Sequence, residues 1–375
     1  MTRKNSQKEI KMKIKVLKYG SGGPGIFLTR LERELEKRGL IDNLNPDVII
    51  SSGFVRTKKK LILRLDTINF EKFTAKAFSG FLRYRVRISF LAALNDVFSA
   101  LITEKAYNKI ITPFLTRFLF YLMNKKQIRG IKRADCVVYM SHFSRNSYKY
   151  FCRHYGEEKN KIIFNGADLN QFFPKTGAKE GGLRLLSSGD FRPLKRLQDS
   201  LILLREIIKV IPDAKLMVAG KVGPQVMEHL EAIMERNNLR EHVEFLGEVH
   251  FDQLPSSYSN AHIFLHPSWH DACPNVVVES LACGTPVVCS GTGTAEMVGG
   301  GGIVVDEGYN FGFKEYYNFD KIPPLDYNKY LQAVLKIYNN LDYYSRKARQ
   351  RAEEKFDIKK IADQYSGAAE QVFSK

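Results

Sequence analysis

Short apolar runs alternate with longer amphipathic segments along most of the chain. In the first half, the apolar runs predict β-strands at 14–17, 47–51, 60–66, 136–141 and 162–165. Between the first two strands, apolar residues recur at helical spacing from Phe27 to Leu35 before Gly39, which predicts a helix over 25–38. Strands that are apolar throughout are typical of a parallel sheet covered on both faces.

The alternation pauses at the polar segment 174–182 and then begins again. This segment is predicted to be a linker that follows a first domain at 12–173, because it is flexible and poor in apolar residues. Beyond it, apolar runs predict strands at 183–188, 215–220, 243–247, 263–267, 286–290 and 302–306, with helices such as 197–210 and 224–236 between them. Two such arrays predict an α/β protein with two doubly wound, Rossmann-like domains that face a cleft. Residues 1–11 are polar and are predicted to be a disordered extension.

The charge of the chain is strongly positive. Its 58 Lys and Arg residues outnumber 40 Asp and Glu residues, which gives a net charge of +18. Such an excess favours an anionic partner, namely nucleic acid, a phosphorylated small molecule or an anionic lipid surface, although it also serves solubility alone. Residues 71–133 carry 13 of these cations against 3 acidic residues (13 − 3 = +10), together with 11 Phe and Tyr residues.

This basic and aromatic stretch has more than one interpretation, and the sequence leaves them open. Cations interleaved with large apolar side chains, as in 81–90, suit an interfacial helix on an anionic membrane. Alternatively, the aromatic residues belong to the core of the first domain and the cations to its outer face. RNA binding is a third interpretation, but no RRM, KH or zinc-knuckle signature supports it, so no nucleic-acid partner is expected.

The segment after the predicted strand 263–267 has the clearest chemical signal. Pro274 and Asn275 are helix-start signals. The first backbone N–H groups of this helix, at Asn275, Val276 and Val277, are therefore expected to point into the cleft, where a diphosphate can bind.

Two carboxylates flank this helix start. Asp271 precedes it, and Glu279 lies one turn inside an otherwise apolar helix, where a carboxylate can accept two hydrogen bonds from a ribose diol. Alternatively, Asp271 is a helix cap and Glu279 satisfies a backbone group or an Arg. The spacing of the two carboxylates alone does not decide between these roles.

Two further loops offer groups that suit a phosphate. Arg192 and Lys195 follow Gly189 after the strand 183–188, where both can neutralise a departing diphosphate; the alternative is a solvated basic loop. Gly22 and Gly23 follow the first strand, and glycines there let the backbone approach a ligand closely.

Residues 183–306 resemble the donor-binding domain of the family 4 retaining glycosyltransferases. The signature of this family is an acidic residue and a Glu eight positions later, then a small-residue turn and a Pro-Val-Val strand; here it runs from Asp271 through Glu279 to Val288. The segments 243–247, 266–268 and 294–298 are also similar to the family. Asp271 departs from the pattern, because Glu is more common there and Asp is shorter by one methylene group.

This resemblance implies the GT-B architecture, with an acceptor-side first domain and a donor-binding second domain at 183–356. A helix at 357–375 is then expected to cross back to the first domain. The implied reaction moves a hexose-type sugar from a nucleoside diphosphate to an acceptor hydroxyl, with retention at the anomeric carbon. The acceptor is expected to be a lipid-linked or surface glycan.

The resemblance also assigns roles to residues. Lys195, Arg192 and the helix start at Pro274, Asn275 and Val276 stabilise the diphosphate, while Glu279 holds the ribose and Asp271 the transferred sugar. Asp66 ends the strand 60–66 and is assigned to the acceptor or a donor hydroxyl, with a helix cap as the alternative. The remaining donor-side assignments are Gly22, Gly23, Gly189, Gly247 and Glu296, whereas Asn165 and Gly166 are assigned a structural role.

No metal and no cofactor beyond the donor sugar nucleotide are expected. The eight histidines and five cysteines show no paired metal-ligand spacing, and enzymes that resemble this chain bind the diphosphate without a metal. Unpaired cysteines are typical of a reducing cytosol, and the first residues lack the apolar stretch of a signal peptide. We therefore expect a cytoplasmic protein, peripheral on the cytoplasmic membrane face if residues 71–133 bind lipid.

The sequence is also compatible with three other functions. The chain is alternatively a catalytically inactive GT-B protein that binds or scaffolds, or a basic nucleic-acid-binding protein. An epimerase on the same fold is the nearest enzymatic alternative.

Overall fold

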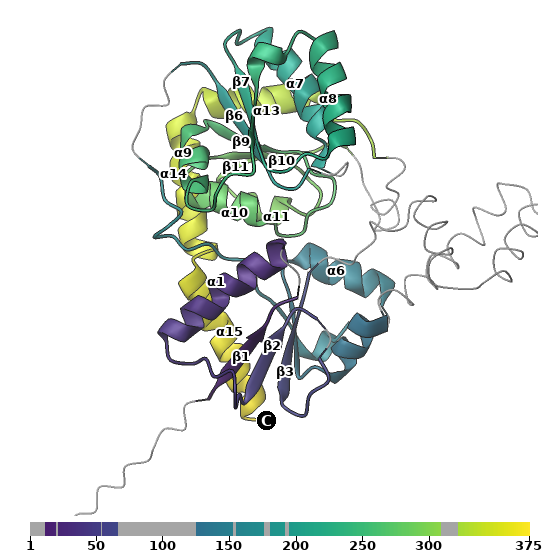
Figure 1. Cartoon of the computed structure of the whole chain (residues 1–375), viewed down its shortest axis with the longest axis vertical. Coiled ribbons are helices and arrows are strands. Elements are labelled where there is room, and N and C mark those ends of the chain that lie inside the picture. The colour runs from purple at the N-terminus through teal and green to yellow at the C-terminus, as the bar shows by residue number, and fades with distance from the viewer. Residues whose placement is uncertain are drawn as a thin grey trace, which may run out of the picture.

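The computed structural model describes residues 12–19, 22–53, 55–66, 125–152, 155–175, 181–191, 195–308 and 322–375. These residues form two α/β domains, one above the other in Figure 1, and each contains one parallel sheet. The predicted fold of two doubly wound domains is therefore confirmed. The basic stretch at 71–133 lies outside the described residues up to residue 124.

The sheet of the first domain has five strands in sequence order. They are β1 (Ile14–Leu17), β2 (Val48–Ser51), β3 (Lys60–Leu65), β4 (Cys136–Tyr139) and β5 (Asn160–Ile162). Every residue of β2 and β4 is buried, which explains why these runs are apolar without alternation. The expected strand at 162–165 instead occupies Asn160–Ile162, because the chain leaves the sheet where Asn165 turns to bind Cys273 of the second domain.

Helices α1 (Gly23–Lys37) and α6 (His142–Phe151) and the 3-10 turn Glu157–Lys159 accompany this sheet. The helix expected at 25–38 begins earlier, since Pro24 occupies its first turn, where no backbone N–H is needed. Ser141 caps α6 by accepting a hydrogen bond of 3.0 Å from the Ser144 N–H.

The sheet of the second domain has six strands, whose order is β11-β10-β9-β6-β7-β8. The strands are β6 (Arg184–Ser188), β7 (Lys215–Ala219), β8 (Val243–Gly247), β9 (Ile263–His266), β10 (Val287–Ser290) and β11 (Gly302–Val305). The order therefore grows outwards in two directions from the β6–β9 pair. This reversal makes a topological switch point, where the connections of neighbouring strands leave to opposite faces of the sheet.

Helices cover both faces of this second sheet. They are α7 (Leu197–Ile208), α8 (Pro224–Arg236), α9 (Leu254–Asn260), α10 (Asn275–Ala282), α11 (Ala295–Val298) and α13 (Tyr327–Tyr338), with a 3-10 turn at Arg240–His242. Two buried apolar clusters lie against the sheet, one on the side of α7 and α13 and the other on the side of α10. Among the described residues, no helix has both the length and the apolar character needed to cross a membrane.

The last two helices connect the domains. Helix α14 (Leu341–Lys355) packs against α10, and α15 (Ile358–Phe373) then continues along the first domain (Figure 1). Between them the backbone of Ala167 exchanges hydrogen bonds of 2.9 and 3.0 Å with Phe356 and Ile358. Apolar residues of α15, such as Ile361, are buried in the same cluster as β1, β2 and α1. The C-terminal segment is therefore part of the first domain's core.

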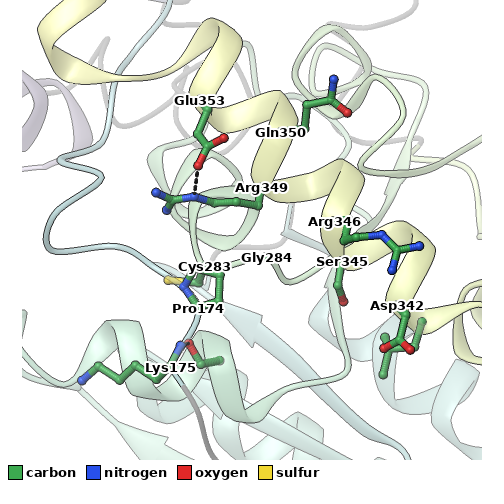
Figure 2. A pocket seen from close by; sticks show the side chains of 12 residues that line it. Pro174, Lys175, Cys283, Gly284, Asp342, Ser345, Arg346, Arg349, Gln350 and Glu353 are labelled. Atoms are coloured by element: carbon green, nitrogen blue, oxygen red, sulfur yellow. Dashed lines mark hydrogen bonds and ion pairs between the residues drawn. The ribbon is translucent and has the colours of Figure 1, made fainter.

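A hollow of about 470 Å³ lies beside α14, where the chain passes between the domains. Figure 2 shows Arg349 projecting from α14 toward Glu353 of the next turn and the turn around Cys283 and Gly284. Nη1 of Arg349 donates hydrogen bonds to the carbonyl groups of Phe172 and Ala282, at 2.9 and 2.7 Å. Arg349 thus joins α14 to the end of α10 and to the connecting segment.

We predict that Ile361→Ala will lower the free energy of unfolding by about 2–5 kcal/mol, because it leaves a cavity in the core of the first domain. Far-UV circular dichroism during urea unfolding measures this loss. Trp269 is the only tryptophan of the chain and lies in the second domain, so its fluorescence follows that domain separately. Lys359→Ala, on the exposed face of α15, is the control. An unchanged stability of Ile361→Ala would contradict the integration of α15 into the first domain.

Candidate active site

A cavity of about 1020 Å³ lies between the two domains. Its volume suits a small-molecule site. The carboxyl ends of strands in both sheets face it, with Tyr19, Ser52 and Asp66 from the first domain and Ser188, Gly220 and Asp271 from the second. Parallel strands end at one edge of a sheet, so each domain directs its loops toward the same cavity.

The switch point of the second sheet lies within this cavity. Lys195 is on the connection after β6, Asp271 is on the connection after β9, and α10 begins shortly after Asp271. Strand order reverses between these two strands, so their connections separate and leave a crevice. The sheet topology therefore brings together residues that are 76 positions apart.

Lys195 and Asp271 form an ion pair across this crevice. Their side chains are only 19% and 20% exposed, so solvent screens the pair weakly. The Nε2 atom of His266, at the end of β9, lies 3.4 Å from Oδ2 of Asp271. The carboxylate thus sits between a cation and an imidazole.

These contacts set the ionisation of the site. Burial by itself raises the pKa of Asp271, but the charge of Lys195 and the contact with His266 outweigh it and hold this pKa well below its ordinary value of 3.8. Burial lowers the pKa of His266, and it lowers that of His270 to about 4. At neutral pH the site therefore presents an ionised Asp271 beside neutral imidazoles.

The N-terminus of α10 faces the cavity as the sequence predicted. Pro274 is the capping residue, and the N–H groups of Asn275 and Val276 occupy the first positions, which have no partner within the helix. The expectation of a third free N–H at Val277 is wrong, because this group donates to the carbonyl of Pro274 at 3.1 Å. The Asn275 side chain reaches the first domain, where its Nδ2 donates to the Gly23 carbonyl at 2.9 Å.

Glu279 lies one turn further along α10, and it is 4% exposed. Its Oε1 is paired with Nη2 of Arg30, which belongs to α1 of the first domain. Its Oε2 accepts a hydrogen bond of 3.0 Å from the Tyr258 hydroxyl. Glu279 also lines the cavity, so a ligand there meets a carboxylate held on two sides.

A chain of polar contacts leads from the first domain to α10. Arg64 is fully buried in β3 and pairs with Asp66, and its Nη2 donates to Oδ1 of Asn165 at 2.7 Å. The Asn165 amide then donates to Oδ1 of Asn275 at 2.9 Å and to the Cys273 carbonyl at 2.8 Å. Asp66 and Asn165 both line the cavity, so Asn165 belongs to the site as well as to the structure.

Three of the predicted glycines, Gly22, Gly23 and Gly189, line the cavity. Gly189 has a φ of +141°, a conformation that favours glycine. A Cβ atom on the neighbouring Gly220 would lie 1.9 Å from the Gly189 carbonyl oxygen, so the two loops touch backbone to backbone. The Gly220 N–H donates to the Gly247 carbonyl at 2.6 Å, which makes Gly247 a support of this loop.

The structure places one predicted donor residue, Glu296, at a contact between the domains, and it does not describe another, Arg192. Glu296 accepts hydrogen bonds from the backbone N–H groups of His142 and Phe143 at 2.9 and 2.6 Å, so it binds the N-terminus of α6 in the other domain. Arg192 lies outside the described residues. The donor contact assigned to each of them stays a prediction.

Arg30, Tyr258 and Asn165 are site residues that the sequence reasoning did not assign to ligand binding. The sequence pattern does place Arg30 on the buried side of α1, between Phe27 and Leu31, where a cation is unusual. Its partner lies 249 residues away, however, so the pattern alone did not name it. Among the described residues, no group of three His, Cys, Asp or Glu side chains is placed to hold a metal ion.

Comparison with known proteins agrees with this geometry. Residues 183–315 match the model of the glycosyl transferases group 1. The chain therefore carries a group 1 glycosyltransferase domain. A glycosyltransferase of Methanocaldococcus jannaschii, MJ1607, is 30% identical to this chain over 151 residues, which are 36% of this chain and 37% of that protein. The chain thus spans less than two fifths of that relative's length.

Solved structures extend the likeness to the whole fold. Sucrose-phosphate synthase of Thermosynechococcus elongatus has a TM-score of 0.61 at 19% identity, over 94% of this chain and 82% of that one. HepE of Anabaena, in complex with UDP-glucose, has a TM-score of 0.61 at 17% identity, over 97% of this chain and all of that one (100%). The glycosyltransferase domain therefore forms part of a GT-B fold, as the resemblance implied.

We predict that Asp271→Asn will be less stable than the wild type at pH 7 and that the difference will shrink as the pH falls. The folded pKa of Asp271 is lowered, so its ionised form contributes stability above its unfolded pKa, ordinarily 3.8, and this contribution is lost on acidification below it. Urea unfolding between pH 7 and pH 3 measures the difference. Asp213→Asn, at an exposed position before β7, is the control. A difference that does not change with pH would contradict the ion pair.

Proposed function

We propose that the protein is a glycosyltransferase that moves a sugar from a nucleoside diphosphate sugar to an acceptor hydroxyl in the cleft. The observation that carries this proposal is the convergence of three groups on one cavity. Lys195 and the first N–H groups of α10 suit a diphosphate, and Glu279 suits a ribose diol. The group 1 match and the UDP-glucose bound by HepE, a protein of the same fold, support this reading.

Binding of the donor would rearrange the charges of the crevice. Lys195 now pairs with Asp271, and a diphosphate beside the α10 N-terminus would offer this cation two negative charges in place of one. Asp271 would then be free to accept a hydrogen bond from a hydroxyl of the transferred sugar. At Glu279 each carboxylate oxygen has one protein partner and retains acceptor capacity for a ribose hydroxyl.

The reaction we propose proceeds with retention. The bond between the anomeric carbon and the diphosphate oxygen breaks, and Lys195 with the α10 N-terminus stabilises the departing charge. The acceptor hydroxyl attacks from the same face, and its proton passes to the departing phosphate oxygen. Retention and independence from metal rest on the resemblance to family 4 enzymes.

For the acceptor we propose a lipid-linked or surface glycan, used by a cytoplasmic enzyme at the membrane face. The support is the sequence of residues 71–133, which has an excess of ten cations (13 − 3) and 11 aromatic residues. Cations of this kind each contribute about 1 kcal/mol near an anionic lipid surface.

We predict that UDP, GDP or ADP at millimolar concentration will raise the melting temperature of the wild type, because a ligand that binds only the folded state stabilises it. The nucleotide that does so should bind about 10- to 100-fold more weakly to Glu279→Gln, which loses hydrogen bonds to a charged acceptor. Calorimetry measures both affinities, and Glu244→Gln, exposed on β8, is the matched control.

Stabilisation by none of the three nucleotides would overturn the assignment of the donor site. Binding of oligonucleotides with a steep salt dependence would then favour the nucleic-acid alternative. Nucleotide binding without turnover of any donor sugar would favour the scaffold alternative, and a product with an inverted sugar hydroxyl would indicate an epimerase.

We predict that the protein will sediment with vesicles that contain phosphatidylserine at low salt, and not with neutral vesicles. Replacing Arg83, Arg85 and Arg87 by Gln should weaken this binding by about 100-fold, from about 1 kcal/mol for each cation. Replacing the exposed Lys355, Lys359 and Lys360 in the same way should leave binding unchanged. Equal losses in the two variants, or no sedimentation of the wild type, would exclude this membrane surface.

A further inference from the structure

Arg30 is a cation of the first domain whose binding partners lie at the domain interface. It projects from α1, which faces α10 of the second domain in Figure 1, and its side chain is 6% exposed. Its guanidinium forms an ion pair with Glu279, whose side chain is 5% exposed. The pair therefore joins the two domains in a place that water hardly reaches.

The surroundings of Arg30 come from both domains and from the segment between them. Its guanidinium carbon lies 5.1 Å from the ring centre of Phe172, on the connecting segment, and 5.2 Å from that of Phe251, after β8. Its Nη1 lies 3.4 Å from the Gly166 carbonyl oxygen. This slot is complete only when the domains are in their present arrangement, because α1 must approach Phe251 and Glu279 together.

Arg30 also fixes the direction of the Glu279 carboxylate. Arg30 binds Oε1 from the first domain, and Tyr258 donates to Oε2 from α9 of the second domain. A carboxylate held by one partner can still rotate, whereas two partners on different oxygens fix its plane. The lone pairs that remain are thereby directed, and Glu279 lines the cavity where a ribose would lie.

Other contacts close the same interface without involving Arg30. Asn275 binds the Gly23 carbonyl at 2.9 Å, and Glu296 binds the N–H groups that begin α6. Loss of Arg30 alone therefore leaves polar contacts that keep the domains together. Among the groups that line the cavity next to the proposed ribose, its loss takes from Glu279 one of its two partners and leaves the Tyr258 hydroxyl.

We propose that Arg30 is a positioning residue for the nucleotide, because it orients the ribose-binding carboxylate of Glu279 from the opposite domain. Ribose recognition is then complete only when the two domains are in their present arrangement. This inference rests on the donor site proposed above. It assigns the first domain, through Arg30, a part in nucleotide recognition that is separate from the phosphate contacts.

The test compares three probes by calorimetry: UDP, 2′,3′-dideoxy-UDP and inorganic pyrophosphate, or the GDP or ADP equivalents if one of those binds. Arg30→Met removes the charge at similar length, and Arg30→Lys retains the charge without the planar fork. Arg33→Met is the matched control, because Arg33 is exposed on the same helix.

We expect Arg30→Met to lower UDP affinity by at least about tenfold, Arg30→Lys to recover part of it, and Arg33→Met to bind as the wild type. Affinity for dideoxy-UDP and for pyrophosphate should be the same in Arg30→Met and the wild type, since neither probe offers the ribose diol to Glu279. A purely structural role for Arg30 would instead weaken all three probes together.

Three outcomes overturn the proposal. They are unchanged UDP affinity in Arg30→Met, an equal loss for UDP and dideoxy-UDP, and tighter UDP binding, which would show that Arg30 competes with the ribose. All three leave the donor site itself intact. If the wild type binds none of the nucleotides, the proposed function fails first, so the two failures are distinguishable.

Discussion

A carboxylate buried at a domain interface must be paired, and Glu279 meets this constraint by binding Arg30 of the other domain. Removing one member of such a pair costs about 3–5 kcal/mol, because the remaining charge is left without an opposite charge in a dry environment. Domain opening at this place requires the same separation unless water or a ligand replaces the lost contact. The arrangement of the two domains and the pairing of the Glu279 carboxylate are therefore linked by one interaction.

Other polar contacts along the cleft also pair a residue of one domain with a group of the other. Asn165 leaves β5 of the first domain and binds both Asn275 and Cys273 of the second, which explains why the fifth strand ends at Ile162. Glu296 satisfies the first N–H groups of α6, which otherwise have no partner within their helix. Helices α14 and α15 add a covalent connection, because one packs on the second domain and the other completes the core of the first.

The chemical character of the cleft comes from topology and electrostatics together. The switch point between β6 and β9 separates two connections and leaves Lys195 facing Asp271. The charge of Lys195 keeps the pKa of Asp271 low in spite of burial, while burial keeps His266 and His270 neutral. The crevice therefore presents the Lys195 cation and the first N–H groups of α10 beside neutral imidazoles.

The sequence by itself determined the two parallel sheets, the positions of most strands and helices, and the carboxylates and cation near the α10 start. These are local properties, since an apolar run, a Pro-Asn helix start or a glycine turn acts over a few residues. Only the tertiary structure decided the partners of those side chains. Arg30 with Glu279, Asn165 with Asn275 and Glu296 with α6 each join residues more than a hundred positions apart. No local pattern encodes such pairs, because they arise only when two folded domains meet.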